Sequence, residues 1–169
     1  LKSAVLPEQD TPTEPPTLTL LAVEDVDAAQ IRDFDDWAAY HNLIGEAAER
    51  DADDDGDGLR NIFEAFFGRN PHVAETAPVL TISAGEVNGQ QVVVLEFDRT
   101  TYSQSFGIRF ENSEDLDAWV NAAGLTEHVQ PVDGSIERVR LASPRDAPMK
   151  FYRVAADLAG AGHGTAARR

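Results

Sequence analysis

The sequence lacks cysteine, has few basic residues and contains no long hydrophobic run. The absence of cysteine excludes a disulfide framework and thiolate metal ligands. Lysine and arginine total 14 against 30 acidic residues, and the resulting net charge of -16 argues against nucleic acids and anionic membranes as partners. No apolar run approaches the ~18 residues that a membrane-spanning helix requires. We therefore expect neither a nucleic-acid partner nor a membrane span.

Signatures of catalysis are also missing from the sequence. There is no G-x-S-x-G motif, and the four histidines are scattered without zinc-ligand spacing. Glu111 and Asp115 could be read as a glycosidase pair, but pairs of carboxylates are common in so acidic a chain. The sequence therefore predicts a protein that is not an enzyme.

The composition along the 169 residues predicts an α+β protein in four parts. Residues 1–32 are an extended linker, rich in proline, threonine and acid in its first half, with a strand expected at Thr17–Val23. Residues 33–76 form a short helix–loop–helix segment, residues 77–157 a small antiparallel β-sandwich, and residues 158–169 a tail of low complexity. The hydrophobic fraction of 42% is enough for a real core.

Two patterns of helical spacing predict the helices of the second part. Asp33 is placed to cap the first helix, and Gly45 to end or weaken it. Gly68 is placed to cap the C-terminus of the second helix. The apolar positions are Phe34, Trp37, His41 and Ile44 in the first pattern, and Ile62, Phe63, Phe66 and Phe67 in the second.

About six short β-prone runs follow from Pro78 onward and predict the sheets. Residues 112–120 interrupt these runs as a turn or a single helical turn. The turn signals between strands are Asn88-Gly89 and Asp133-Gly134.

Three single residues outside the acidic loop receive structural interpretations. We expect His41 to be a packing residue beside the first helix's tryptophan. Trp119 is expected in the core, because large aromatic side chains dominate small β-sheet cores. Arg153 is expected to pair with Asp115.

An acidic loop stands between the two predicted helices. Five aspartates crowd into residues 51–57, and residues 24–64 hold fourteen acidic residues against three basic ones. Like charges at this density repel one another, so either the loop is simply solvated or a cation sits among the carboxylates. The pattern D-x-D-x-D-G-x5-E, which runs from Asp53 to Glu64, favours the cation.

Calcium fits this spacing best, because it takes roughly six to eight oxygen ligands. Alternate residues of a tight loop can turn three carboxylates inward, and Gly58 permits the turn that brings the next carbonyl round. Magnesium and manganese are weaker alternatives, since magnesium prefers fewer carboxylates and retains its waters. The expected ligands are Asp53, Asp55, Asp57, the Leu59 carbonyl, Asn61 and Glu64, whereas Asp54 and Gly56 face outward.

The eighth position of the loop indicates what kind of site this is. Arg60 stands where paired calcium loops carry an aliphatic residue that contacts the second loop, and this sequence has no second loop. A lone loop predicts a structural calcium site and not a paired switch.

The stretch Phe34–Pro71 carries a wider pattern that includes a tryptophan-bearing helix, the acidic loop and the ending N-x-x-E-x-x-x-G-x-x-P. It resembles a calcium-binding segment of large secreted proteins from verrucomicrobia, planctomycetes and related bacteria, and its loop resembles the EF-hand-like loops of dockerins and thrombospondin type 3 repeats. The resemblance implies structural calcium binding outside the cell. Ala65-Phe66 departs from the Tyr-Ala that is frequent there. The matching residues are Trp37, Leu43, Gly45, Asp53, Asp55, Asp57, Gly58, Asn61, Glu64, Gly68 and Pro71.

The second half of the chain carries the motif E-x-S-x-D-L-x-x-W at residues 111–119 and the run F-Y-R at residues 151–153. These features are similar to the β-rich C-terminal module that often follows the calcium segment in the same secreted proteins. The resemblance covers about residues 34–156.

Together these features predict a non-catalytic, extracellular or cell-surface calcium-binding module. Calcium would rigidify a subunit of a surface structure or filament, and Thr17–Val23 would pair with the sheet of another copy. The expected partners are other copies of the chain or other domains of a larger secreted protein. The alternative is a carbohydrate-binding or adhesion accessory of a secreted polysaccharide-degrading protein, with Trp37, Trp119 and three tyrosines as its aromatic residues.

Overall fold

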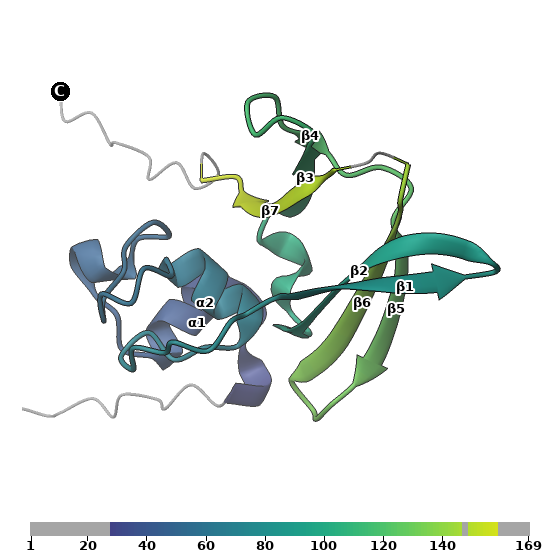
Figure 1. The fold of residues 1–169 in the computed structure, drawn as a ribbon. Helices are drawn as coiled ribbons and strands as arrows, with labels where there is room; N and C mark the ends of the chain where they lie inside the picture. Colours follow the sequence, from purple (N-terminus) through teal and green to yellow (C-terminus); the bar gives the residue numbers. More distant parts are fainter. Residues whose placement is uncertain (1–27, 147–148, 159–169) are drawn as a thin grey trace, which may run out of the picture.

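The computed structural model of the chain describes residues 28–146 and 149–158. Figure 1 shows two short α-helices at one side of the molecule and the strands at the other. This arrangement confirms the mixed α+β class. The strand expected at Thr17–Val23 lies outside the described residues. The elements are η1 (Ala28–Gln30), α1 (Phe34–Tyr40), η2 (Gly45–Ala48), α2 (Asn61–Phe67), β1 (Thr81–Val87), β2 (Gln90–Thr100), η3 (Ser103–Ser105), β3 (Ile108–Ser113), β4 (Val120–Asn121), β5 (Thr126–Pro131), β6 (Ile136–Pro144) and β7 (Phe151–Ala156).

Helix α1 begins as predicted but ends earlier. The side chain of Asp33 accepts a hydrogen bond from the backbone N–H of Asp36 at 2.9 Å and so caps the helix. The helix stops at Tyr40, because Asn42 adopts a left-handed backbone (φ 56°) that closes the C-terminus. Ile44 therefore lies beyond the helix and is 82% exposed, so its placement on the apolar stripe is wrong.

Helix α2 agrees with its predicted pattern. Gly68 follows it in the left-handed conformation (φ 69°) and donates its backbone N–H to the Glu64 carbonyl. The left-handed conformation favours glycine here, and a Cβ atom at Gly68 would lie 2.6 Å from Cδ1 of Ile136, so that side chain would have to shift. Six of the seven residues of α2 are buried, which ties this short helix firmly to the rest of the molecule.

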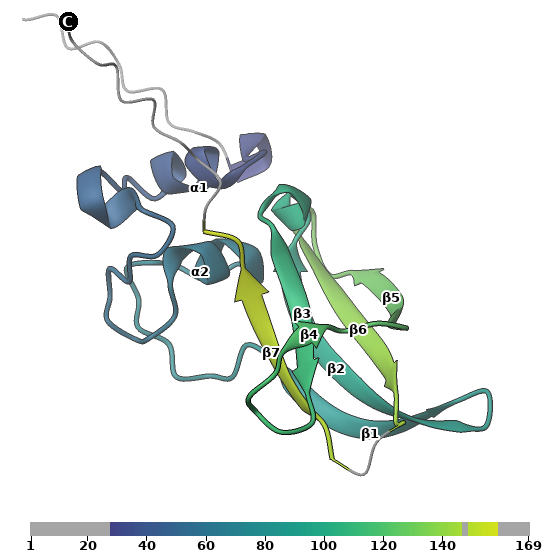
Figure 2. The same cartoon turned by 90° about the horizontal axis from the view of Figure 1, so that it is seen from above.

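The strands form two antiparallel sheets with the orders β1-β2-β6-β5 and β4-β3-β7. Figure 2 shows the smaller sheet lying across the larger one. Strands β1 and β2 are joined by the predicted turn at Asn88-Gly89, whose residues both have positive φ. Asp133 closes the β5–β6 connection by accepting hydrogen bonds from the backbone N–H groups of Ser135 and Ile136.

One hydrophobic core joins the helices to both sheets. Phe97 on β2 is its centre: its ring contacts Phe66 of α2 at 5.9 Å and stacks on Phe110 of β3 at 5.0 Å between centroids. The buried hydroxyl of Thr100 on β2 donates to the Ala65 carbonyl at 3.0 Å. Helix α2 is therefore held by the sheets, and the loop before it is held with it. Among the described residues, no helix has the length and apolar character that crossing a membrane requires.

Candidate metal site

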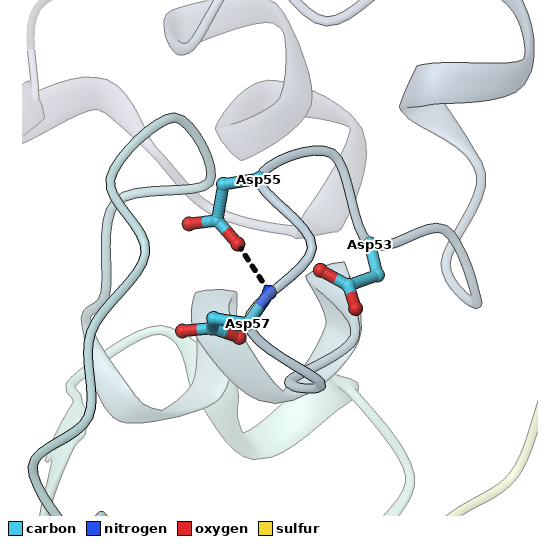
Figure 3. Close-up of side chains that lie close together, drawn as sticks. All are labelled: Asp53, Asp55 and Asp57. Atoms are coloured by element: carbon cyan, nitrogen blue, oxygen red, sulfur yellow. Dashed lines mark hydrogen bonds between the residues drawn. The ribbon is translucent and has the colours of Figure 1, made fainter.

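The acidic loop lies between η2 and α2 and brings together three of the predicted ligand residues. Asp53, Asp55 and Asp57 each offer a carboxylate oxygen, and these oxygens lie within 4.8 Å of one another. Figure 3 shows the three side chains around one turn of the loop, with the carboxylate of Asp55 accepting a hydrogen bond from the backbone N–H of Asp57 at 3.1 Å. Three like charges this close repel one another unless donors or a cation offset them.

Backbone N–H groups hold the loop in a tight turn. The two carboxylate oxygens of Asp53 accept hydrogen bonds from the N–H groups of Gly56 and Gly58, both at 2.9 Å. Asp57 Oδ1 accepts from the N–H of Leu59 at 2.7 Å. Gly58 has φ 92°, a conformation that residues with a side chain rarely adopt. The glycine at the sixth position of the loop therefore makes the sharp turn that the spacing predicted.

Asn61, the first residue of α2, has an amide with a fixed orientation. The side chain is fully buried, and Nδ2 donates to the carbonyl oxygens of Ala47 at 2.7 Å and of Glu49 at 3.0 Å. Because both amide hydrogens are used, Oδ1 cannot exchange places with Nδ2. Oδ1 is buried and has no hydrogen-bond partner among the described residues. Buried polar atoms without partners are rare in folded proteins, so this oxygen requires an explanation.

Glu64 lies on the same short helix and is 1% exposed. Its Oε2 is also buried without a partner in the described part of the chain. Burial, and after it the negative charges of Asp55, Asp57 and Asp53, raise the pKa of Glu64 to about 7. Glu64 is not a member of the close group of three aspartates, yet their charges act on it. A carboxylate in these surroundings is stabilised either by a proton or by a nearby cation.

A third buried oxygen, Oδ2 of Asp55, likewise has no partner within residues 28–146 and 149–158. Asp55, Asn61 and Glu64 therefore each contribute one unsatisfied oxygen to the loop and the helix that follows it. Carboxylate and amide oxygens are the ligands that hard divalent cations prefer. The Leu59 carbonyl lies in the same turn, and its role as a ligand stays a prediction.

Contacts from the segment after α2 also fix the loop, and the loop pattern did not predict them. Asp57 Oδ2 accepts a hydrogen bond from the backbone N–H of Glu75 at 3.0 Å. His72 donates from Nε2 to the His41 carbonyl at 2.7 Å, while its Nδ1 lies 3.0 Å from the carboxylate of Asp54. The hydrogen bond to the His41 carbonyl and the neighbouring Asp54 raise the pKa of His72. The two residues of each contact are distant in sequence, so a local sequence pattern does not predict these contacts.

The two acids considered as a glycosidase pair have separate structural partners. Glu111 accepts hydrogen bonds from Nε of Arg109 at 2.8 Å and Nε of Arg153 at 2.7 Å, and these bonds hold its pKa below the usual range. Asp115 accepts backbone N–H bonds within its own turn. The expected pairing of Arg153 with Asp115 is wrong, because the register of β3 and β7 places Arg153 opposite Glu111.

The two remaining single-residue predictions have different outcomes. The His41 ring lies 4.8 Å from the Trp37 ring, and burial, with a smaller effect from the His72 charge, lowers its pKa to about 4, which agrees with a packing role. Trp119 is half-buried and lies outside the core, so the core placement is wrong. Trp119 lies in the connection between β3 and β4, and its ring centroid lies 4.2 Å from the Arg153 guanidinium carbon.

Comparisons of the chain with protein-family models, with curated proteins and with solved structures gave no match. The resemblance to calcium-binding segments of secreted bacterial proteins therefore stays a prediction that rests on the sequence motif.

Proposed function

We propose that the protein is a non-catalytic, extracellular structural module that binds one calcium ion. The ion would rigidify a helix–calcium loop–helix segment that packs against a β-sandwich-like part. The calcium would be bound by the loop between η2 and α2 and by the first turn of α2. The ligands would be Asp53, Asp55, Asp57, the Leu59 carbonyl, Asn61 and Glu64.

The buried carboxylate of Glu64 is the observation that carries this proposal. An ionised carboxylate without a partner is costly to bury, and three further carboxylates nearby increase that cost. A divalent cation removes both costs, because it supplies the partner and neutralises the aspartates. The solvated-loop alternative explains the exposed aspartates, but it leaves the buried oxygens of Glu64 and Asn61 unexplained.

Calcium fits the oxygen set better than magnesium does. The loop offers four carboxylates, an amide oxygen and a carbonyl oxygen. Magnesium demands a near-ideal octahedron and usually keeps several waters, whereas calcium accepts many protein oxygens in a flexible geometry. A lone loop with the charged Arg60 at its eighth position also favours a permanent structural ion over a paired sensor.

The position of α2 supports a structural role for the ion. Glu64 is on the same helix as Phe66, which packs on Phe97 of β2, and Ala65, whose carbonyl accepts the Thr100 hydroxyl. Calcium bound at the start of α2 would therefore order the loop and the core together. Metal binding free energy is folding free energy in such an arrangement.

The wider role of the module follows from this rigidity. We propose that it serves as a subunit of a cell-surface structure or filament, with β-strand pairing between chains as the contact. The position of Trp119, which is half-buried and lines a surface groove, favours a second candidate function, in which the module binds a polysaccharide as an accessory of a larger secreted protein.

Isothermal titration calorimetry on chelator-treated protein tests the calcium proposal. We expect one calcium site per chain, and we expect Asp57→Asn and Glu64→Gln each to weaken calcium affinity by roughly tenfold or more. Asp51→Asn is the matched control, since it removes one charge from the same exposed cluster but lies outside the ligand pattern. Its affinity should stay close to that of the wild type.

The outcome that contradicts the proposal is equally direct. Calcium binding that is unchanged in the double variant Asp57→Ala, Glu64→Ala would show that these residues are not ligands. If Asp51→Asn and Asp57→Asn weakened the calcium affinity equally, the acidic cluster would attract calcium nonspecifically and the proposed ligand set would be wrong.

A further inference from the structure

A groove of about 630 Å³ opens where the edge strand β1 meets the start of β7 and the turn before β4. We call it the β1 groove. Ile82, Leu116 and Met149 line it, and each of these large apolar side chains is 56–58% exposed. Trp119 lines it as well. Apolar side chains gathered in this way on a surface indicate a contact site.

The outer edge of β1 is free and unprotected. Strand β1 ends its sheet, and none of its outward N–H and C=O groups pairs with a described residue. Glu86 is the only charged residue of its seven, and it contains no proline. The opposite edge strand, β5, is shorter and carries Glu127, His128 and Pro131. Sheets usually protect an edge with charged residues and proline, so β1 is the edge of this four-stranded sheet that is open to pairing.

The turn beside the groove stores backbone strain. Leu116 has φ 69°, which is unusual for a residue with a large side chain. The turn is held by the Ser113 hydroxyl, which accepts from the Leu116 N–H at 2.9 Å, and by Trp119 Nε1, which donates to the Leu116 carbonyl at 3.2 Å. The strained backbone of Leu116 places its side chain in solvent and not in the core. Because strained residues cluster at binding sites, this position indicates a contact site.

We propose that residues 17–23 of a second copy of this chain add to the free edge of β1 as an extra strand, with Leu18, Leu20 and Ala22 in the β1 groove. This inference rests on the proposed function, because it assigns both surfaces of the contact between subunits. The donor segment has seven residues, as β1 has, and the three inserted side chains form its wholly apolar face.

Charge complementarity supports this donor. Glu14 precedes the segment and Glu24 follows it, and residues 3–27 contain no basic side chain. The groove is bordered by Arg145, whose guanidinium has no ion-pair partner among the described residues, and by Lys150, which pairs with Asp146. The acids that flank the donor would therefore meet the positive charge of Arg145 at the border of the groove, whereas the charge of Lys150 is offset by Asp146.

The length of the connecting chain favours a second copy over the chain's own segment. Ala28 lines the same small cavity as Thr100, at the end of β2 away from the groove. Reaching the start of the β1 edge from there means moving four residues back along β2 and two strand spacings sideways, or about 16 Å. Four residues lie between Val23 and Ala28, and the five Cα-to-Cα steps across them span at most about 18 Å when fully stretched. The chain's own segment would thus need a nearly taut connector.

Two variants of the full-length chain test the contact, with calcium present. Leu20→Asp disables the donor, and Thr19→Asp is its control because it puts the same charge on the other face. Ala84→Pro disables the acceptor. The two-residue turn makes Val87 and Gln90 a hydrogen-bonded pair. Because N–H groups along a strand alternate in direction, the N–H of Ala84 points away from β2. A proline at position 84 therefore leaves the hydrogen bonds between β1 and β2 intact. Ala84→Val, which keeps that N–H, is the control.

Light scattering at increasing concentration gives the decisive readout. We expect wild type and both controls to associate, while Leu20→Asp and Ala84→Pro stay monomeric at the same concentrations. An equimolar mixture of Leu20→Asp and Ala84→Pro should form a pair of chains, because one retains the acceptor and the other the donor. A monomeric wild type, or a mixture that stays monomeric while each control associates, would overturn the proposal.

Two further measurements separate the alternatives. Calorimetry with calcium should give wild-type affinity for Leu20→Asp and Ala84→Pro; lost calcium binding in the wild type would defeat the proposed function and not the strand contact. Gels that contain soluble xylan or β-glucan test the polysaccharide alternative. Retardation of the wild type that Leu116→Asp abolishes would assign the groove to carbohydrate and overturn strand pairing.

Discussion

Glu64 joins two environments within one residue. Its backbone belongs to a helix that is buried against β2, while its carboxylate faces the charges of the acidic loop. The core thereby fixes where the carboxylate lies, and the loop determines whether it is stable there. Asn61 is held in the same way, by two carbonyls of the preceding segment. In the folded chain, packing and hydrogen bonds therefore hold both of these proposed ligand residues.

We predict that Glu64→Gln changes stability with opposite sign in the absence and presence of calcium. Without calcium at pH 8, glutamine removes a buried charge that has no partner, and the free energy of unfolding should rise by about 1–2 kcal/mol. With calcium in excess, the variant loses a ligand and should be less stable than wild type. Urea denaturation with chelator and with calcium measures both values. A variant that is destabilised in both conditions would show that Glu64 has only a packing role.

At the scale of elements, patterns within about ten residues predicted the structure well. The end of α2 at Gly68 and the hairpin turn at Asn88-Gly89 were predictable because each depends only on residues that adopt a positive φ readily. The end of α1 was missed because Asn42 can also adopt that conformation, ahead of the glycine at position 45.

Partners that come from different strands were not predictable in this way. Arg153 and Glu111 meet only because β7 pairs with β3, and a single sequence does not reveal that register. The grouping of Asp53, Asp55 and Asp57 was predictable because they lie close together in sequence, whereas the contact of Glu75 with Asp57 comes from beyond α2. Trp119 was misplaced because hydrophobicity alone does not show that it lies in the connection between β3 and β4 and not on a core-facing strand position.

We predict that the pairing of β3 with β7 weakens in acid through Glu111. Its two arginine bonds lower the pKa, so the folded state favours the ionised form more than the unfolded state does. The stabilisation is present above the unfolded pKa and is lost as the pH falls through the lower folded value. Glu111→Gln should therefore be less stable than wild type at pH 7, with the difference shrinking towards pH 3.

Urea midpoints at several pH values check this prediction. Glu114→Gln is the control, since Glu114 is an exposed acid close to the same strand end. A difference between Glu111→Gln and wild type that stays constant from pH 7 to pH 3 would contradict the role of the ionised carboxylate.

At the scale of the whole molecule, the shared core makes the loop and sheets one unit. Phe97 contacts α2 on one side and β3 on another, so loosening α2 also removes support from the sheets. Local melting of the loop alone is therefore not expected. Removal of the proposed calcium ion should therefore be detected by probes in both the helical part and the sheets.

We predict that calcium raises the unfolding temperature of the whole protein. With a dissociation constant of about 10 μM and calcium at about 1 mM, binding adds about 2.7 kcal/mol. For a chain of this size that corresponds to a shift of roughly 5–10 °C. Thermal unfolding followed by both circular dichroism and tryptophan fluorescence, with chelator and with calcium, measures it. Coincident transitions at a temperature that the chelator does not change would show that calcium binding at the loop does not contribute to stability.

If the protein is extracellular as proposed, the burial of α2 between the loop and the sheets also bears on its export. If the proposed ion is needed for that helix to pack stably, a newly made chain in a calcium-poor cell interior would remain incompletely folded and could pass through a narrow export channel. Calcium outside the cell would then complete folding, and the free edge of β1 would form only where other copies of the chain are to be bound. Export and assembly would be ordered in time by the cation gradient, without a chaperone dedicated to that edge.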